Sequence, residues 1–211
     1  KPQSHREHSI RNAYSTLNER FLHQVHYALS VGIHPWLVSE NWKAEFIDIE
    51  RHVLSPSVVA IGECGLDRLK GPHLEMQTEV LEAHIHLANQ HQKPLILHLV
   101  KTYSDMLSLA KGIHIPWIVH GFKGNYISAK NLIDKGACLS FGPRLMLEKE
   151  LQNLFKQLPL NQIYLETDTK PVLIDSVYTF AAELLEKSID ELENIIQENF
   201  ERDFSVVLPK L

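Results

Sequence analysis

The chain has 211 residues, of which 44% are hydrophobic and 22% charged, as is typical of a globular protein with a full hydrophobic core. The net charge of −5 excludes a protein that is basic as a whole. Any binding to nucleic acid must therefore use a local basic patch.

Two further features of the composition limit where the protein works. Polar residues interrupt every apolar run well before the ~18 residues that a bilayer span requires, so we expect a soluble protein without a membrane segment. The two cysteines, Cys64 and Cys138, stand far apart with no C-x-x-C spacing. This argues against a disulfide framework and a zinc knuckle, and it favours a reducing compartment such as the cytoplasm.

Short apolar runs alternate with longer helical patterns along the whole chain. After a weaker candidate at 10–16, we expect strands at 25–31, 58–61, 94–99, 116–119, 137–141 and 163–165. Between them we expect helices at 39–54, 74–92, 103–111, 125–135, 147–157 and 175–187. A last helix begins at Ser188 and runs to about Phe200. Ser39 is the expected N-cap of the first helix, and Ser188 with Glu191 forms a capping box before the last.

This alternation predicts an α/β fold with a parallel sheet. The sequence contains no G-x-G-x-x-G or G-x-x-x-x-G-K-S/T loop, so a closed (β/α) barrel is favoured over an open doubly wound sheet. Eight βα units usually need ~250 residues. We therefore expect one short TIM-like barrel domain over residues 1–211, whose first strand precedes Lys1 and is absent from the chain.

Acidic and imidazole side chains follow four of the predicted strands. Glu63, His98, His120 and Asp168 each come at the carboxyl end of an apolar run. Because the carboxyl ends of parallel strands meet at one face of a barrel, we expect these side chains to converge. A lone histidine or aspartate there is usually a hydrogen-bonded or capping residue. Two imidazoles and two carboxylates together favour a divalent metal site.

Five motifs occur in an order that resembles one known family. They are GIHPW (32–36), AIGECGLD (60–67), PLILH (94–98), IVHGFKG (118–124) and LETD (165–168). In this order they resemble the TatD-type metal-dependent deoxyribonucleases of the amidohydrolase superfamily, over about residues 25–204.

The resemblance implies a distorted barrel with two divalent ions (zinc, manganese or magnesium) that hydrolyses phosphodiester bonds at DNA ends. It implies that Glu63 bridges the two ions and that His98 and His120 hold one of them. Asp168 would hold the other ion and act as general base, so Glu63 and Asp168 are the expected catalytic residues. Two ions about 3.5–4 Å apart suit this chemistry because they acidify a water molecule and stabilise charge on the reacting oxygens.

One departure from the family concerns its first strand, which ends in an H-x-H pair. His5 and His8 stand three apart in a polar segment and are poor substitutes for that pair. We expect the pair to lie upstream of Lys1. The chain as given would then bind the ion held by His98 and His120 better than the other ion, and would have weak or no nuclease activity.

Cations follow several strands and would surround the metal site. The expected substrate-binding residues are His34, Lys101, Lys123 and Arg144, and we expect Arg68, Lys70 and Lys170 at the same face. His34 could bind a phosphate oxygen or hold its loop. Trp36 and Trp42 could stack on bases or pack in the core or in a lid.

Two other functions remain open on the sequence. The same centre could serve an amidohydrolase-type enzyme that acts on a small substrate, which the fold alone does not separate from a nuclease. Without an H-x-H pair, the chain could also be a non-catalytic binding protein.

Overall fold

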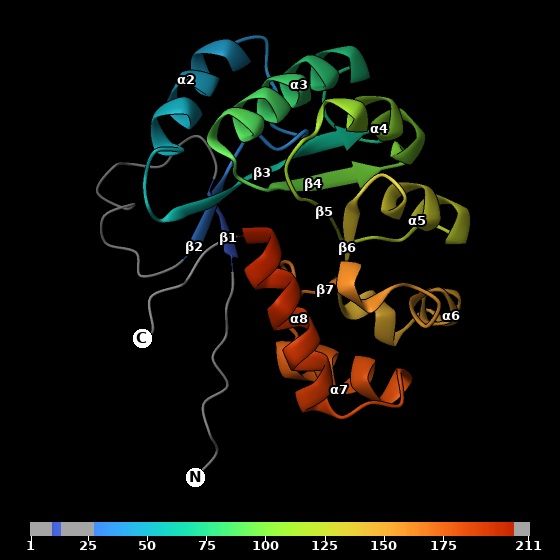
Figure 1. Ribbon diagram of the computed structural model, residues 1–211. Coiled ribbons are helices and arrows are strands. Elements are labelled where there is room, and N and C mark those ends of the chain that lie inside the picture. The colour runs from blue at the N-terminus through green and yellow to red at the C-terminus, as the bar shows by residue number, and fades with distance from the viewer. Residues whose placement is uncertain (1–9, 14–27, 205–211) are drawn as a thin grey trace.

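The structure, a computed structural model, describes residues 10–13 and 28–204 (Figure 1). Its described strands form one seven-stranded parallel sheet in which each strand pairs with the next in sequence. The strands are β1 (Ile10–Ala13), β2 (Ala28–Val31), β3 (Val58–Asp67), β4 (Leu95–Val100), β5 (Trp117–His120), β6 (Ala137–Phe141) and β7 (Ile163–Leu165). This sequential order confirms the predicted barrel-type winding and excludes a doubly wound sheet.

The weak strand candidate near the amino end is real, because β1 pairs in register with β2 from Ile10 opposite Ala28. Within the described residues β1 and β7 form no ladder, so the sheet is a curled half-barrel. His5, His8 and the first part of the strand expected at 25–31 lie outside the described residues. A strand before Lys1 stays a prediction.

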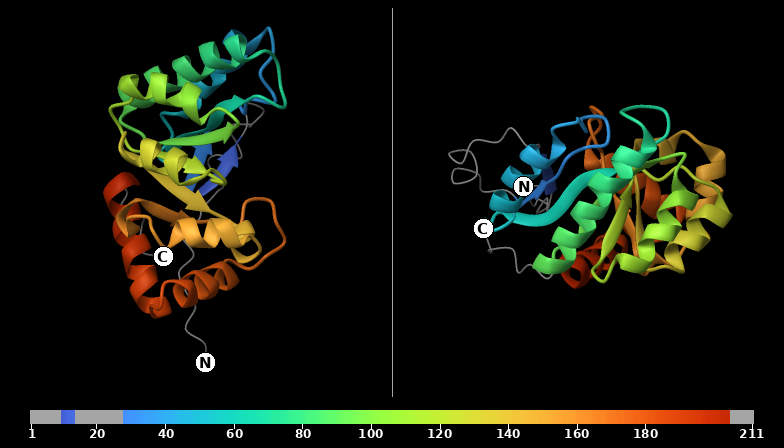
Figure 2. Two further views of the ribbon diagram at one scale, coloured as in Figure 1. Left: turned by 90° about the vertical axis from the view of Figure 1, so that its right-hand side faces the viewer. Right: turned by 90° about the horizontal axis from the view of Figure 1, so that it is seen from above.

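Helices surround the curled sheet, as the views in Figure 1 and Figure 2 show. They are α2 (Trp42–His52), α3 (Leu74–His91), α4 (Tyr103–Leu109), α5 (Tyr126–Ile133), α6 (Lys149–Phe155), α7 (Ile174–Leu184) and α8 (Ile189–Phe204). Short 3-10 turns lie at η1 (Ala110–Gly112), η2 (Pro143–Met146) and η3 (Leu160–Gln162). No helix in the described parts of the chain is both long and apolar enough to cross a membrane.

Helix ends show where local sequence signals succeed and where one fails. The capping box is confirmed, because the Glu191 backbone N–H donates to Ser188 Oγ at 3.2 Å and the Ser188 N–H donates to Glu191 Oε2 at 2.9 Å. The Ser39 N-cap is wrong. α2 begins at Trp42 and its N-cap is Asn41. The Ser39 hydroxyl instead accepts the Asn41 N–H at 3.1 Å, within the turn that precedes the helix.

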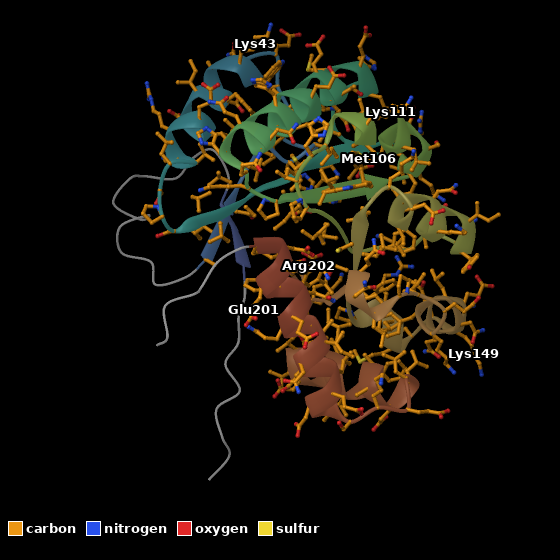
Figure 3. All side chains as sticks on the ribbon, in the orientation of Figure 1. Lys43, Met106, Lys111, Lys149, Glu201 and Arg202 are labelled. Atoms are coloured by element: carbon orange, nitrogen blue, oxygen red, sulfur yellow. The ribbon has the colours of Figure 1, made fainter. Side chains whose placement is uncertain are left out.

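Alternate residues of the central strands pack under the helices: Leu97, Val119 and Leu139 are each 0% exposed, and Phe141, on the same side of β6 as Leu139, contacts Phe155 of α6 with ring centroids 5.0 Å apart. The opposite side of β6 and β7 meets α8 through a buried polar cluster. There the Tyr164 hydroxyl donates to Asp203 Oδ2 at 2.8 Å, and the Cys138 thiol lies 3.3 Å from the same oxygen. Arg202, labelled on α8 in Figure 3, pairs with Asp203 and balances its charge. The helix is thereby fixed against the sheet that carries the site.

Candidate metal centre

Strand register brings three of the predicted ligands together. His98 on β4 is the direct partner of His120 on β5, and it is also paired with Gly65 on β3. Glu63 Oε1 lies 2.5 Å from His120 Nε2 and 3.2 Å from His98 Nδ1. Two imidazoles from neighbouring strands therefore converge on one carboxylate oxygen.

The predicted position of Glu63 after its strand is wrong, whereas His98 lies inside the strand expected at 94–99. β3 continues to Asp67 and β4 to Val100, so both side chains lie inside strands. Glycines explain the continuation of β3, whose register with β4 shifts between Ile61 and Cys64.

Gly62 and Gly65 flank Glu63 and its neighbour Cys64, with φ angles of +136° and +144°. A Cβ at Gly62 would lie 2.4 Å from the Ile96 carbonyl oxygen, and one at Gly65 would lie 2.0 Å from the His98 carbonyl oxygen. Only glycine allows this backbone path so close to β4. The close approach places the Glu63 carboxylate beside the two imidazoles.

The electrostatics of the cluster favour an ionised Glu63. Burial alone would raise the pKa of Glu63, but hydrogen bonds from His120 and His98 hold it well below its usual range. Burial would lower the pKa of His120, but its hydrogen bonds with Glu166 and Glu63 raise it to about 10. His120 is therefore a protonated imidazolium between two carboxylates when the site holds no ion.

His34 lies in the cluster itself. Ligand atoms of His34, Glu63 and His98 all lie within 4.8 Å of one another, a spacing that could hold a cation. The Trp36 backbone N–H donates to His34 Nδ1 at 3.2 Å, which leaves the ring proton on Nε2, 3.7 Å from Glu63 Oε1. Burial lowers the pKa of His34 to about 4, so this ring is neutral near pH 7. In this arrangement His34 holds its loop and faces Glu63.

Two carboxylates that the sequence analysis did not select complete the cluster. Asp67 Oδ2 lies 3.2 Å from His98 Nε2, and Glu166 Oε1 lies 3.3 Å from His120 Nδ1. Each histidine is thus set between two carboxylates, an arrangement that orients metal-ligating imidazoles. The signal for both was present, since Asp67 ends the AIGECGLD motif and Glu166 directly follows β7.

Asp168 follows β7 in a turn, with an exposed side chain and a φ of 51°. Within the described residues its side chain makes no hydrogen bond or ion pair, and the structure does not join it to the cluster of Glu63, His98 and His120.

The predicted substrate-binding cations Lys101 and Lys123 lie in loops after β4 and β5, Arg144 lies in η2 after β6, and all three are exposed. Lys101 and Lys123 have no carboxylate partner among the described residues. Arg144, in contrast, forms an ion pair with Glu148, whose Oε1 accepts its Nε–H at 2.6 Å. Its charge is therefore largely balanced.

The donors present fit a divalent ion. A nitrogen of His98 and a nitrogen of His120 both lie beside Glu63 Oε1, and a second carboxylate lies behind each imidazole. Mixed imidazole and carboxylate ligands suit zinc and manganese. An ion would replace the proton that His120 shares with Glu63.

A family model described as TatD related DNase matches residues 5–205. The chain belongs to this family, whose members include metal-dependent hydrolases. Its motif-based resemblance is thereby confirmed.

Curated relatives and solved structures agree with this assignment. The chain is 25% identical to the uncharacterized metal-dependent hydrolase YcfH of Escherichia coli, over 86% of this chain and 75% of that protein. It is 28% identical to the uncharacterized metal-dependent hydrolase TatD of Mycobacterium tuberculosis, over 84% and 76%. The crystal structure of the TatD homolog YjjV from Escherichia coli superposes with a TM-score of 0.85 at 22% identity, covering 93% of this chain and 86% of that one. This last likeness shows the barrel-type fold.

Proposed function

We propose that this chain is a metal-dependent phosphodiesterase that removes nucleotides from DNA ends, using two divalent ions (zinc, manganese or magnesium). The convergence of His98 and His120 on Glu63 Oε1 is the observation that carries the proposal. The family description supports DNA as the substrate. The two free cysteines are both buried and suit a protein of the cytoplasm.

The proposed roles follow from position and charge. Glu63, ionised and buried, would help to hold both ions, and His98 and His120 would complete the site of one of them. Asp168, exposed beyond β7, would be a ligand of the other ion and would take a proton from the attacking water. When bound, the ions acidify this water and stabilise charge on the phosphate oxygens. His34 keeps Glu63 in place and borders the substrate.

Phosphates of the strand bind on an exposed rim, which we define as Lys101, Lys123 and Arg144 after β4, β5 and β6. Lys101 and Lys123 carry charges that no described carboxylate balances, so they contribute most of the attraction. Arg144 contributes less because Glu148 holds its guanidinium.

The test is hydrolysis of an end-labelled single-stranded oligonucleotide by the metal-stripped chain, after adding back zinc, manganese or magnesium. We expect shortening of the strand only with added metal, and a loss of at least a hundredfold in Glu63→Gln and in Asp168→Asn. Glu148→Gln, a matched change of an exposed glutamate that pairs with Arg144, should keep nearly full activity.

The two other functions give different results in the same experiment. Metal-dependent hydrolysis of small esters or amides with intact DNA would favour the amidohydrolase function. Metal binding without hydrolysis of either substrate would favour a binding protein. Activity of Glu63→Gln equal to that of the unsubstituted chain would overturn the proposed site.

A further inference from the structure

We propose that Trp36 and Lys70 form a subsite for one unpaired nucleotide beside the candidate metal centre, with the base on the indole and a phosphate on the ammonium group. This inference rests on the proposed function and specifies which part of the substrate the chain recognises.

Trp36 is exposed but held in a fixed position. Its side chain is 45% exposed, while its Nε1–H donates to Asp67 Oδ2 at 2.5 Å. The indole centroid lies 4.8 Å from that of His34 and 5.5 Å from that of His98, in edge-to-face contacts. The polar edge of the ring is therefore satisfied on the metal-centre side, while much of its apolar surface remains in water. A base stacked there has its own phosphate next to the candidate ligands.

The loop opposite Trp36 is held rigidly by Gln77 of α3. The Gln77 side chain is 1% exposed, accepts the Asp67 N–H at 2.7 Å, and donates to the Pro72 carbonyl at 2.7 Å. Gly71 lies so close to the loop after β2 that a Cβ would be 2.4 Å from the Pro35 carbonyl oxygen. The loops after β2 and β3 are therefore fixed relative to each other before any ligand binds.

A cavity of about 720 Å³ lies between these two loops. Val38, Ser39 and Glu40 line one side, and residues 67–74 line the other. Asp67 belongs to this lining and also holds the Trp36 indole, so the cavity borders the subsite. Asp67 is also the residue that links this space to the metal centre, because its Oδ2 lies 3.2 Å from His98 Nε2.

Lys70 is the cation of this region that is available to a phosphate. Its Nζ lies 4.0 Å from the centroid of the Trp36 ring, and within the described residues it has no carboxylate partner. Arg68 also lines the cavity, but its Nη2 donates hydrogen bonds to both carboxylate oxygens of Asp105, at 2.7 and 2.9 Å. The flexible Lys70 side chain can turn from the indole to a phosphate as a base takes its place.

An aromatic face next to a cation matches the chemistry of a nucleotide. Proteins bind unpaired strands through stacking on aromatic side chains and through cations along the backbone. A base inside a duplex offers no free face, so the subsite selects a frayed or single-stranded end. A ligand without a base would contact only Lys70.

The experiment measures binding in EDTA, so that it does not depend on hydrolysis. The probes are two oligothymidylates of equal length, one complete and one with an abasic residue at the terminal position. Binding is followed through the quenching of tryptophan fluorescence and confirmed by competition with a dye-labelled strand. We expect the complete strand to bind on the order of tenfold more tightly, as stacking of one base predicts.

Two variants of Trp36 separate its aromatic face from its hydrogen bond. Trp36→Leu should abolish the difference between the two strands, whereas Trp36→Phe should keep most of it. A preference for the complete strand that persists in Trp36→Leu would overturn the inference, as would equal or undetectable binding of both strands to the unsubstituted chain. Thermal melting checks that both variants are folded.

The chain contains a matched control pair. Lys43 and Trp42 both belong to α2, and Lys43 Nζ lies 5.6 Å from the centroid of the Trp42 ring. The two residues face α3, away from the metal centre, and Figure 3 labels Lys43. Lys70→Met should lower the slope of log K against log salt by about 0.7, the contribution of one single-strand phosphate. Lys43→Met and Trp42→Leu should leave binding unchanged. An equal effect of both lysine variants would refute the subsite.

Failure of the subsite and failure of the proposed function are distinguishable. A base preference in EDTA without hydrolysis in any metal would keep the subsite and contradict the nuclease. Hydrolysis of DNA without any base preference in EDTA would keep the nuclease function and contradict the subsite.

Discussion

His98 and His120 are direct register partners on β4 and β5, and their rings, with centroids 5.7 Å apart, both reach Glu63 Oε1. Parallel pairing places equivalent residues of adjacent strands side by side on one face. The candidate metal centre is therefore a property of the sheet itself, and mobile loops are not needed to assemble its core.

The backbone path of β3 should tolerate no side chain at Gly65. Gly65→Ala would place a Cβ 2.0 Å from the His98 carbonyl oxygen at a φ of +144°, so we expect a loss of at least ~3 kcal/mol in the free energy of unfolding. Urea denaturation measures it. Gly112→Ala is the control, because its Cβ would lie 4.0 Å from Ile85 Cγ2, in ordinary contact. Equal stability of the two variants would contradict the close approach of β3 to β4.

Metal binding should release a proton from His120. Although burial opposes it, the carboxylates of Glu166 and Glu63 raise the pKa of His120 to about 10, so near pH 7 an ion must displace this proton. Affinity should then rise about tenfold per pH unit below that value. Calorimetry in buffers of different ionisation enthalpy counts the protons released.

Removing one of the two carboxylates tests whether they cause the raised pKa of His120. In Glu166→Gln the pKa of His120 should fall and proton release near pH 7 should shrink, whereas Glu198→Gln, at an exposed position on α8, should change nothing. Metal binding without net proton release in the unsubstituted chain would be incompatible with this account.

The exposed rim should act through charge and not through the metal. The double variant Lys101→Met and Lys123→Met should raise KM for DNA several-fold and lower the salt slope by about 1.4, for two phosphates. Arg144→Met should have a smaller effect because Glu148 already balances the arginine. Lys149→Met, on α6, is the control (Figure 3). If the salt slope of the double variant is unchanged, the rim does not bind DNA.

His84 should make stability depend on pH. This fully buried ring donates from Nδ1 to the Val80 carbonyl at 2.7 Å and accepts the Ile33 N–H at Nε2, next to His34. Burial lowers the pKa of His84 to about 4, from 6.5 in an unfolded chain. The unfolded state therefore takes up the proton first as pH falls. The stabilisation is fully present above pH 6.5 and lost toward pH 4, with ~2 kcal/mol lost at pH 5.

Urea denaturation of His84→Leu at pH 7 and pH 5 checks this. The variant should be ~1–3 kcal/mol less stable at pH 7, because the buried Ile33 N–H loses its acceptor, and should lack the part of the pH dependence due to His84. His86→Leu, exposed on the same helix, should behave as the unsubstituted chain. An unaltered pH dependence in His84→Leu would assign the effect to other groups.

Much of the fold could be predicted from local pattern. The alternation of apolar runs and helical periods indicates the parallel sheet and its order, because each strand and helix is specified by residues close in sequence. The motifs that contain Glu63, His98 and His120 indicate one site, since parallel strands present their side chains at a shared face. Even the short run at β1 is visible as a weak strand.

What only the tertiary structure decided depends on residues far apart in the chain. The Trp36 indole reaches Asp67 across 31 positions, and His120 reaches Glu166 across 46, contacts that no local spacing encodes. The continuation of β3 past Glu63 depends on its close packing against β4, and only this packing shows why glycine is needed at positions 62 and 65. The availability of a charged side chain to a ligand is likewise decided by the tertiary structure. A basic residue can be read from the sequence, but whether its charge is available to a ligand depends on the carboxylate that the fold places beside it.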